Sequence, residues 1–400
     1  MNFEYSDEQR LLSETLRKFL NTGYGFDARA KITATPAGFS EDVWAALAEM
    51  GILGVPFEEK FGGFGGTTVD MMVVMEALGE ALVVEPYLAT VGLGGRFVAR
   101  GGSAEQRARI LPALIQGKHK MAFAQTEVDA RWDLRRVTTR ATKSGDGWVL
   151  EGDKRAVRDG DHYVVTGQKI WTTLGHYGDW IFCLVRTDPK TEKRQDGISF
   201  LLIDMTTPGI TVRPIVLLDQ SREVNEVFFD EVRVPAENLV HEENKGWTVA
   251  KFLLGYERMG TGNIAVCKRE LARVKELAAR AGLLDDPRFA DRLTRVEVEL
   301  MALEITNLRF LDQLRGGRPP GAEVSLLKIK GTEIQQALTE LMMQTAGPLA
   351  PIFRPVAPDA PFDAFTATLF PRYCNVRKAT IYAGSNEIQR NIIAKATLGL

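Results

Sequence analysis

The sequence predicts an α+β chain of several domains, in which a helical region, an antiparallel β region and a helical bundle follow one another. Apolar residues recur at three- and four-residue spacing up to about residue 120 and again after about residue 240. Between these regions, short segments rich in Val, Ile, Thr and aromatic residues alternate with Gly, Asp and Pro. Because four hundred residues exceed what one simple core covers, we expect an N-terminal helical domain at 1–120, a middle β domain at 121–240 and a four-helix bundle at 241–400.

Three segments carry the helical spacing of the first region. They are EQRLLSETLRKFL (8–20), DVWAALAEMGILG (42–54) and VDMMVVMEALGEALVV (69–84), and the glycine-rich FGGFGG (61–66) separates the last from the others.

The predicted strands of the middle region include a repeat. GDGWVLEGDK (145–154) and GDHYVVTGQK (160–169) read as two copies of one hairpin placed back to back. DWIFCLV (179–185), GISFLLIDM (197–205) and EVFFDEVRV (226–234) complete the strand pattern. We expect one hairpin to be surplus, and therefore to extend a sheet edge or to project as an exposed ribbon.

Start and stop signals mark the helices of the third region. Asp286-Pro287 predicts a helix start, and GGRPPG (316–321) predicts its end. A second helix is expected over SLLKIKGTEIQQALTELMMQ (325–344), and a last one begins near Ser385. The chain has neither a GxGxxG motif nor alternating strands and helices, so a Rossmann fold is not expected.

Composition excludes several classes of function. The net charge of −2 argues against nucleic-acid binding, and no apolar run reaches the roughly 20 residues of a membrane span. The N-terminus does not resemble a signal peptide, and three well-separated cysteines favour a reducing compartment, so a cytoplasmic protein is expected. The four histidines lack metal-ligand spacing, and we expect neither a metal site nor a metal hydrolase: His119, His162, His176 and His241.

Four motifs in order carry a resemblance that spans the whole chain. AFAQTE (122–127), GQKIWTT (167–173), FFDEVRVPAENL (228–239) and IYAGSNEIQR (381–390) resemble the acyl-CoA dehydrogenase family. The resemblance implies the fold of that family, FAD as cofactor, an acyl-CoA substrate, and an electron-transfer flavoprotein or similar acceptor. A homodimer or homotetramer assembled through the C-terminal helices is expected because the long apolar faces of 286–315 and 323–346 exceed what the bundle of one chain covers.

Two motifs supply the flavin contacts that the resemblance implies. In the first, Phe123, Gln125 and Thr126 fall on flavin-contacting positions, although the small residues that usually follow are replaced by Arg131 and Trp132. In the second, the flavin contacts are Trp171, Thr172 and Thr173. The first hairpin copy has Ala156-Val157-Arg158 in place of this tripeptide, so we interpret the second copy as the functional one.

The two halves of the chain resemble different members of the family. The part up to about Ala156 is similar to the small chain of two-subunit enzymes of the pimeloyl-CoA or steroid-side-chain type, and the part after it is similar to the large chain. We interpret the repeat as a junction between two paralogous sequences, with a plain tandem duplication as the alternative.

The resemblance also indicates the catalytic base. Many members have a glutamate at the position of Ala383, which cannot take a proton. Other members place it before an arginine on a helix early in the third domain, and Glu257 followed by Arg258 matches that pattern. We expect Glu257 to abstract the α proton and the backbone N–H of Ala383 to bind the thioester oxygen.

The remaining contacts follow from the same resemblance. Ser385 and Glu387 correspond to flavin-nucleotide contacts, and Gln344 and Gly347 to positions that hold a neighbouring subunit's cofactor. The expected substrate contacts are Trp247, Arg258, Tyr382, Ala383 and Gly384. Two alternatives stay open beside an active dehydrogenase: a non-catalytic partner subunit of a heteromeric enzyme, and a flavin oxidase on the same fold.

Overall fold

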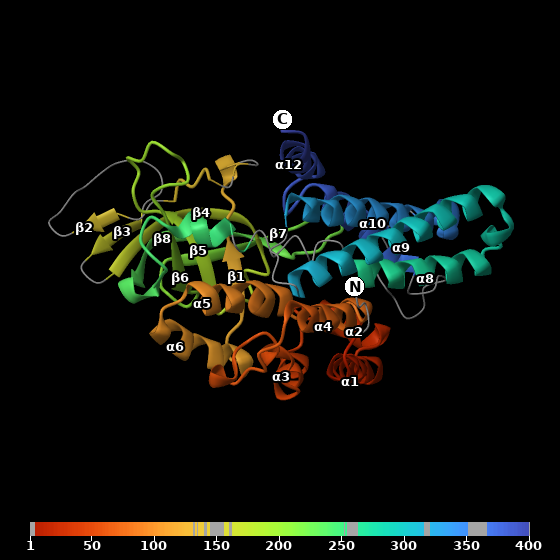
Figure 1. Cartoon of the computed structure of the whole chain (residues 1–400), viewed down its shortest axis with the longest axis horizontal. Coiled ribbons are helices and arrows are strands. Elements are labelled where there is room, and N and C mark those ends of the chain that lie inside the picture. The colour runs from red at the N-terminus through yellow and green to blue at the C-terminus, as the bar shows by residue number, and fades with distance from the viewer. Residues whose placement is uncertain are drawn as a thin grey trace.

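The computed structural model describes residues 5–130, 133, 135–139, 142–144, 156–159, 162–251, 253, 263–315, 321–350 and 366–399. Helices make up both ends of the chain, and two β-sheets lie between them, so the predicted α+β architecture is confirmed. Figure 1 shows the β-sheets at one end of the molecule, the long helices α8, α9 and α10 at the other, and the N-terminal helices along one side of both.

The N-terminal helices bury their apolar faces together and against the first β-sheet. Trp44, Phe57 and Phe97 belong to one buried cluster with Phe182 and Phe200 of the sheet. The α-helices are α1 (Asp7–Gly23), α2 (Phe26–Ala34), α3 (Glu41–Glu49), α4 (Thr68–Glu80), α5 (Arg96–Gly101) and α6 (Ala104–Ile115). Short 3₁₀ turns at Ile52–Gly54 and Glu59–Phe61 and a π-helical turn at Leu88–Gly95 connect them.

The middle region consists of a four-stranded sheet in the order β1-β5-β6-β9 and a five-stranded sheet in the order β2-β3-β4-β8-β7. The strands are β1 (Met121–Ala124), β2 (Thr142–Ser144), β3 (Ala156–Asp159), β4 (His162–Thr173), β5 (Trp180–Arg186), β6 (Ile198–Asp204), β7 (Ile210–Ile215), β8 (Val224–Pro235) and β9 (Leu239–Val240). β1 pairs with β5, and β2 with β3, in parallel. The predicted antiparallel pattern therefore has two exceptions among the described strands.

β5 is buried on both faces because it lies between the helices and the second sheet. Phe182 and Leu184 pack into the cluster of the N-terminal helices, whereas Ile181, Cys183 and Val185 pack against the second sheet. A strand covered on both sides needs a continuous apolar run, and this accounts for the sequence WIFCLVR.

β4, the strand of the second copy, pairs antiparallel with β3, which carries the Ala156-Val157-Arg158 segment of the first copy. β2, which precedes the first copy, pairs with β3 at the edge of the five-stranded sheet. The rest of the first copy, at 145–154, lies outside the described residues. The origin of the repeat stays a prediction.

The C-terminal helices pack around α10 (Ser325–Ala346). It contacts α8 (Ile264–Arg280), α9 (Pro287–Arg315), α11 (Thr366–Val376) and α12 (Asn386–Leu398). A 3₁₀ turn, η9 (Arg377–Thr380), follows α11 and leads toward α12. α4 of the N-terminal region packs against α8, so the two helical regions touch directly.

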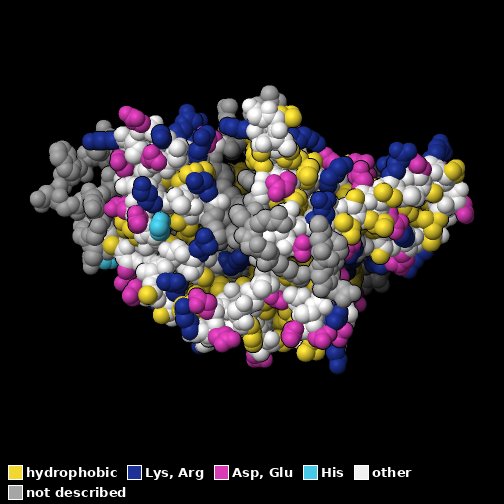
Figure 2. Space-filling view, in the orientation of Figure 1, with side chains coloured by type: hydrophobic (Ala, Val, Ile, Leu, Met, Phe, Trp, Pro, Cys, Tyr) yellow, Lys and Arg dark blue, Asp and Glu magenta, His cyan; other side chains and the backbone are white. Residues whose placement is uncertain are grey.

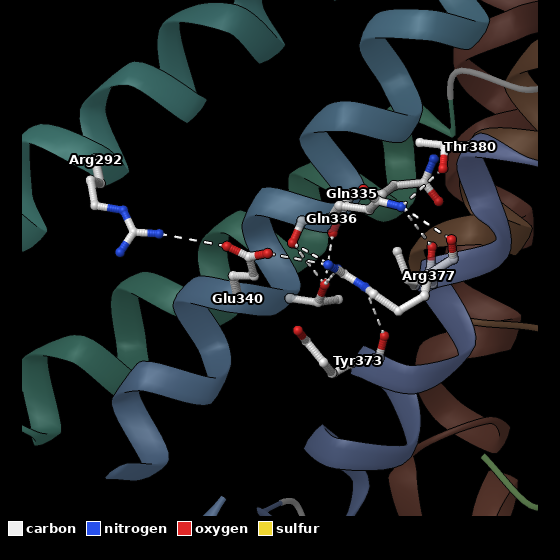
Figure 3. A network of polar contacts seen from close by, with 9 residues as sticks. Arg292, Gln335, Gln336, Glu340, Tyr373, Arg377 and Thr380 are labelled. Atoms are coloured by element: carbon white, nitrogen blue, oxygen red, sulfur yellow. Dashed lines mark hydrogen bonds and ion pairs between the residues drawn. The ribbon is translucent and has the colours of Figure 1, made fainter. Parts of the chain in front are cut away.

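Arg377 of η9 forms hydrogen bonds to α10 that hold the two segments together (Figure 3). Its guanidinium donates to the Gln336 carbonyl at 3.1 Å, the Thr339 hydroxyl at 2.9 Å and the Glu340 carboxylate at 3.2 Å. Its Nε donates to the Tyr373 carbonyl at 3.2 Å. The planar fork of arginine suits such divergent acceptors, whereas a lysine ammonium is a single point charge.

We expect Arg377→Ala to lower the free energy of unfolding by about 1.5–3 kcal/mol, because it removes several hydrogen bonds of a charged donor. Thermal denaturation compared with Arg295→Ala tests this. Among the described residues Arg295 pairs with Asp291 alone, one helical turn away and exposed, so that variant should change stability by about 0.5 kcal/mol or less. Equal effects of the two substitutions would contradict the assignment of the Arg377 network as a stabilising junction.

Candidate functional site

A cavity of about 1220 Å³ lies where the three regions meet. Its walls come from the α4 region, from the ends of β1 and β4, and from α8 and the segment that follows η9. Its volume is slightly above the usual range of roughly 300–1,000 Å³ for ligand pockets. Of the residues expected from the sequence to bind cofactor or substrate, the following line it: Gln125, Thr126, Trp171, Thr173, Tyr382, Ala383, Gly384 and Ser385.

A β-bulge presents Trp171 to the cavity. The pairing of β4 with β8 shifts register between Lys169 and Thr172, and Trp171 adopts a left-handed backbone conformation with φ of 59°. As a result Trp171 is 53% exposed, whereas Thr172 is buried in the sheet. Bulges and strained backbone often occur next to functional sites, where they redirect a side chain. The indole and the Thr173 side chain therefore both reach the cavity wall.

Another part of the lining is a left-handed turn before α12. Ala383 and Gly384 have φ values of 51° and 81°. The φ of Gly384 lies in a region that L side chains rarely adopt, and a Cβ there would also come within 2.5 Å of the side-chain Nε2 of Gln389, so glycine is favoured at this position. Ser385 caps α12 by accepting a hydrogen bond from the Ile388 amide. The turn holds the Ala383 backbone against the cavity without any side-chain base.

Several expected contacts lie away from the cavity lining. Phe123 stacks on Phe182 at 4.6 Å between ring centroids, and Trp247 packs against the core of the N-terminal region. Thr172 is buried within the sheet, and Glu387 is exposed in the first turn of α12.

The four remaining residues of the expected site fall into two groups. Gln344 and Gly347 lie at the C-terminal end of α10, outside the lining, and their predicted role concerns a neighbouring subunit. Glu257 and Arg258 lie outside the described residues.

Three carboxylates that the sequence motifs did not indicate also line the cavity: Glu76, Glu85, and Glu223, which pairs with Lys378. Glu76 of α4 accepts a hydrogen bond from the Tyr5 hydroxyl at 3.3 Å, and Glu85 accepts one from the Tyr24 hydroxyl at 2.9 Å. Burial raises the pKa of both carboxyl groups. Both lie in or after a helix that reads as ordinary amphipathic sequence, which gives no sign of the cavity they face.

A buried ion pair joins the two segments that form the flavin motifs. The Lys169 ammonium lies 2.7 Å from the Glu127 carboxylate, and their side chains are 0% and 1% exposed. The Glu127 carboxylate also accepts hydrogen bonds from the backbone N–H and hydroxyl groups of Thr138 and Thr139. Burial tends to raise the pKa of Glu127, but Lys169 and these hydrogen bonds outweigh it and lower the pKa to about 2.

A signal for this pair was present in the sequence. Lys169 falls on the same alternate positions of β4 as Tyr163 and Val165, which are buried. A lysine on the inward face of a strand needs a buried carboxylate partner.

The cavity meets a simple requirement for a bound cofactor. The buried Oε1 of Gln389, a lining residue, has no hydrogen-bond partner within the described part of the chain. An unmatched acceptor at a cavity wall fits a ligand that carries a donor. In the same described ranges, no group of three or more His, Cys, Asp or Glu side chains could hold a metal ion. Nor is any helix described there both long and apolar enough to cross a membrane.

Three family models match the chain in order. They are the acyl-CoA dehydrogenase N-terminal domain at residues 6–118, middle domain at 155–232 and C-terminal domain at 244–398. The middle-domain match begins directly after residues 145–154.

Relatives and solved structures agree with these matches. The acyl-CoA dehydrogenase IpdE1 of Mycobacterium tuberculosis is 34% identical over 88% of this chain and 86% of its own. The steroid ACAD Tcur3481-Tcur3483 has a TM-score of 0.86 at 26% identity and covers 100% of this chain and 99% of its own. The ChsE4-ChsE5 complex from Mycobacterium tuberculosis has a TM-score of 0.84 at 28% identity, with coverage of 100% and 99%. The chain therefore belongs to the acyl-CoA dehydrogenase family of oxidoreductases.

Proposed function

We propose that the chain is an FAD-dependent dehydrogenase that removes hydrogen from the α and β carbons of an acyl-CoA thioester. One observation carries this proposal: a single cavity is lined both by Gln125, Thr126, Trp171 and Thr173 and by the Tyr382–Ser385 turn. The first group is the expected flavin contact, and the turn is the expected thioester contact. Bound FAD would supply the hydride acceptor.

Residues of the chain itself bind the cofactor, remove the proton and bind the thioester oxygen. The Trp171 indole offers an aromatic face to the cofactor, and the Gln125, Thr126 and Thr173 side chains offer hydrogen bonds. Glu257 takes the proton from the α carbon, and the backbone N–H of Ala383 donates to the thioester oxygen, where negative charge develops. One donor of this kind typically contributes about 2.7–4 kcal/mol to stabilisation of the transition state.

The proposal predicts that FAD co-purifies and that Trp171 contacts its ring system. The purified protein should be yellow and should bleach when acyl-CoA is added anaerobically. Trp171→Ala should weaken FAD binding, with an increase in Kd of about 5- to 150-fold if one aromatic stacking contact contributes roughly 1–3 kcal/mol. Trp148→Ala in the first hairpin copy is the matched control and should leave Kd unchanged. The reverse pattern would assign the flavin to the first copy.

A second function is favoured by one of the comparisons. The solved ChsE4-ChsE5 relative is a complex of two different chains, and Arg131 and Trp132 replace the usual small residues here. A chain that completes another subunit's site would bind FAD weakly or would fail to bleach with any acyl-CoA. Activity that appears only after a second chain is added would identify this alternative.

The rate at which oxygen reoxidises the reduced flavin distinguishes a dehydrogenase from an oxidase. Slow reoxidation favours a dehydrogenase with an electron-transfer flavoprotein as acceptor, and rapid reoxidation favours an oxidase.

We further propose a homodimer or homotetramer assembled through the C-terminal helices. The outer face of α9 exposes Val298, Met301 and Ile305, which are 59%, 62% and 50% exposed. Hydrophobic side chains lie among charged ones over the long helices at the right of Figure 2. An exposed apolar stripe of this kind is typical of an interaction surface.

Light scattering at micromolar concentration tests the assembly. The parent should be larger than a monomer, and Met301→Glu should shift it toward smaller species because a charge in an apolar interface is not compensated. Leu11→Glu on α1, where Leu11 is 65% exposed, should leave the mass unchanged. A parent that is monomeric at this concentration would contradict the proposal.

A further inference from the structure

The segments that carry the two expected flavin motifs come from different parts of the middle domain. Gln125 and Thr126 follow the end of β1, in the four-stranded sheet, whereas Trp171 and Thr173 lie on β4, in the five-stranded sheet. Both pairs line one wall of the cavity. The shape of that wall therefore depends on how the end of β1 is held against β4.

Two contacts join these segments directly. The Ile170 amide donates to the Thr126 carbonyl at 3.0 Å, and the Lys169 ammonium donates to the Glu127 carboxylate at 2.7 Å. Thr126 and Glu127 line the cavity themselves, and Ile170 and Lys169 lie one and two positions before the lining residue Trp171. Glu127 itself reaches the lining, and Lys169 lies behind it with no exposed surface.

The Glu127 carboxylate also fixes the chain that follows. Both of its oxygens are used: Oε1 accepts from Lys169 and Thr139, and Oε2 accepts from Thr138. One carboxylate thus ties together the end of β1, β4 and the segment at 138–139. A side chain with this many charge-assisted hydrogen bonds has one geometry.

We propose that the Glu127–Lys169 pair is a positioning device that sets the spacing between the Gln125–Thr126 and Trp171–Thr173 segments for flavin binding. This inference rests on the proposed function for the identity of the ligand. The pair would touch neither substrate carbon nor any proton that is transferred. It would act through the four residues that it holds in place.

The test is a set of three variants measured for FAD affinity by titration of the apoprotein, at a temperature where each is fully folded. Glu127→Gln and Lys169→Met each break the pair, and the double variant removes both charges. Each single variant is prone to unfold because it leaves one buried charge without its partner, whereas removal of both charges is often nearly neutral for stability. The double variant therefore keeps the test valid if a single variant does not fold.

We expect Kd for FAD to rise by roughly 10- to 100-fold in the double variant, as is typical when groups that orient a binding residue are removed. Lys120→Met is the matched control, because Lys120 pairs with Glu41 at 3.1 Å at the opposite end of β1, outside the cavity lining. Its FAD affinity should equal that of the parent. A double variant that binds FAD as tightly as the parent would overturn the proposal.

Hydrogen exchange separates this proposal from the proposed function. If the parent binds no FAD, the proposed function fails, and protection of the Ile170, Thr138 and Thr139 amides then decides the positioning role. Faster exchange at these amides in the double variant, with no change in Lys120→Met, supports the role of the pair as a positioning device. Unchanged protection overturns it.

Discussion

Glu257→Gln should lower the rate of flavin reduction by acyl-CoA by about 10²–10⁴-fold, the usual effect of losing a general base. The substitution keeps the size and the hydrogen bonding of the side chain but removes its basicity. FAD content and acyl-CoA binding should therefore change little. Stopped-flow absorbance of the flavin, with acyl-CoA in excess and oxygen excluded, measures the reduction step separately from binding.

The cavity supplies its own controls for this experiment. Glu76 and Glu85 are carboxylates in the lining whose pKa values are raised by burial. Glu76→Gln and Glu85→Gln should each leave flavin reduction within a few fold of the parent if Glu257 is the base. A loss of reduction in either control, with Glu257→Gln unaffected, would place the base on the wall formed by α4 and the segment after it.

A glutamate at position 383 offers a gain-of-function test. Many members of the family that this chain resembles have the catalytic glutamate at this position, and Ala383 lines the cavity. Ala383→Glu in the Glu257→Gln background should restore part of the flavin reduction. A parent that is never reduced by any acyl-CoA would instead favour the partner-subunit alternative.

Glu127→Ala should lower the free energy of unfolding by about 3–5 kcal/mol, because it leaves the Lys169 ammonium buried without its partner. This is the largest effect on stability that we predict. Calorimetry at a fixed scan rate and without added FAD measures it, so that cofactor binding does not contribute. The double variant Glu127→Ala/Lys169→Met should recover most of the loss.

The Glu127–Lys169 pair makes the free energy of unfolding depend on pH in the acidic range. The pKa of Glu127 is lowered from 4.5 to about 2 in the folded chain. The folded state therefore binds fewer protons than the unfolded state between these values, and stability falls as pH decreases. The contribution of Glu127 is fully present above pH 4.5 and is lost as pH falls toward 2. A thermal midpoint that declines equally in the parent and in the double variant over this range would contradict the assignment.

The sequence indicated the long helices more accurately than the strands. Asp286-Pro287 and the following GGRPPG predicted the limits of α9, which runs from Pro287 to Arg315, and α12 begins next to Ser385 as expected. These signals are local, since they concern the first and last hydrogen bonds of a helix. The parallel pairings of β1 with β5 and of β2 with β3 depend on distant segments, and no local signal specifies them.

The candidate site was predictable only in part for the same reason. Trp171 and Ala383 were identified by motif, and both lie on the cavity. Glu76 and Glu85 were not, because a carboxylate that faces a cavity looks in sequence like one that faces water. Phe123 occupies a motif position, but its alternation along β1 directs the ring onto Phe182. Motifs identify the positions that a family uses, whereas packing decides which side chains reach the cavity.

The position of the cavity between three regions has a consequence for biosynthesis. Its lining runs in sequence from Arg29 to Gln389, so a nascent chain cannot complete the pocket until residue 389 has left the ribosome. At roughly 5–20 residues per second, the N-terminal helices emerge well before α12, and domains generally fold in that order. During this interval the surface of α4 that later packs on α8 is open to solvent. Completion of the cofactor pocket must therefore await the emergence of α12, and we expect the demand for chaperones to be greatest just before α12 docks.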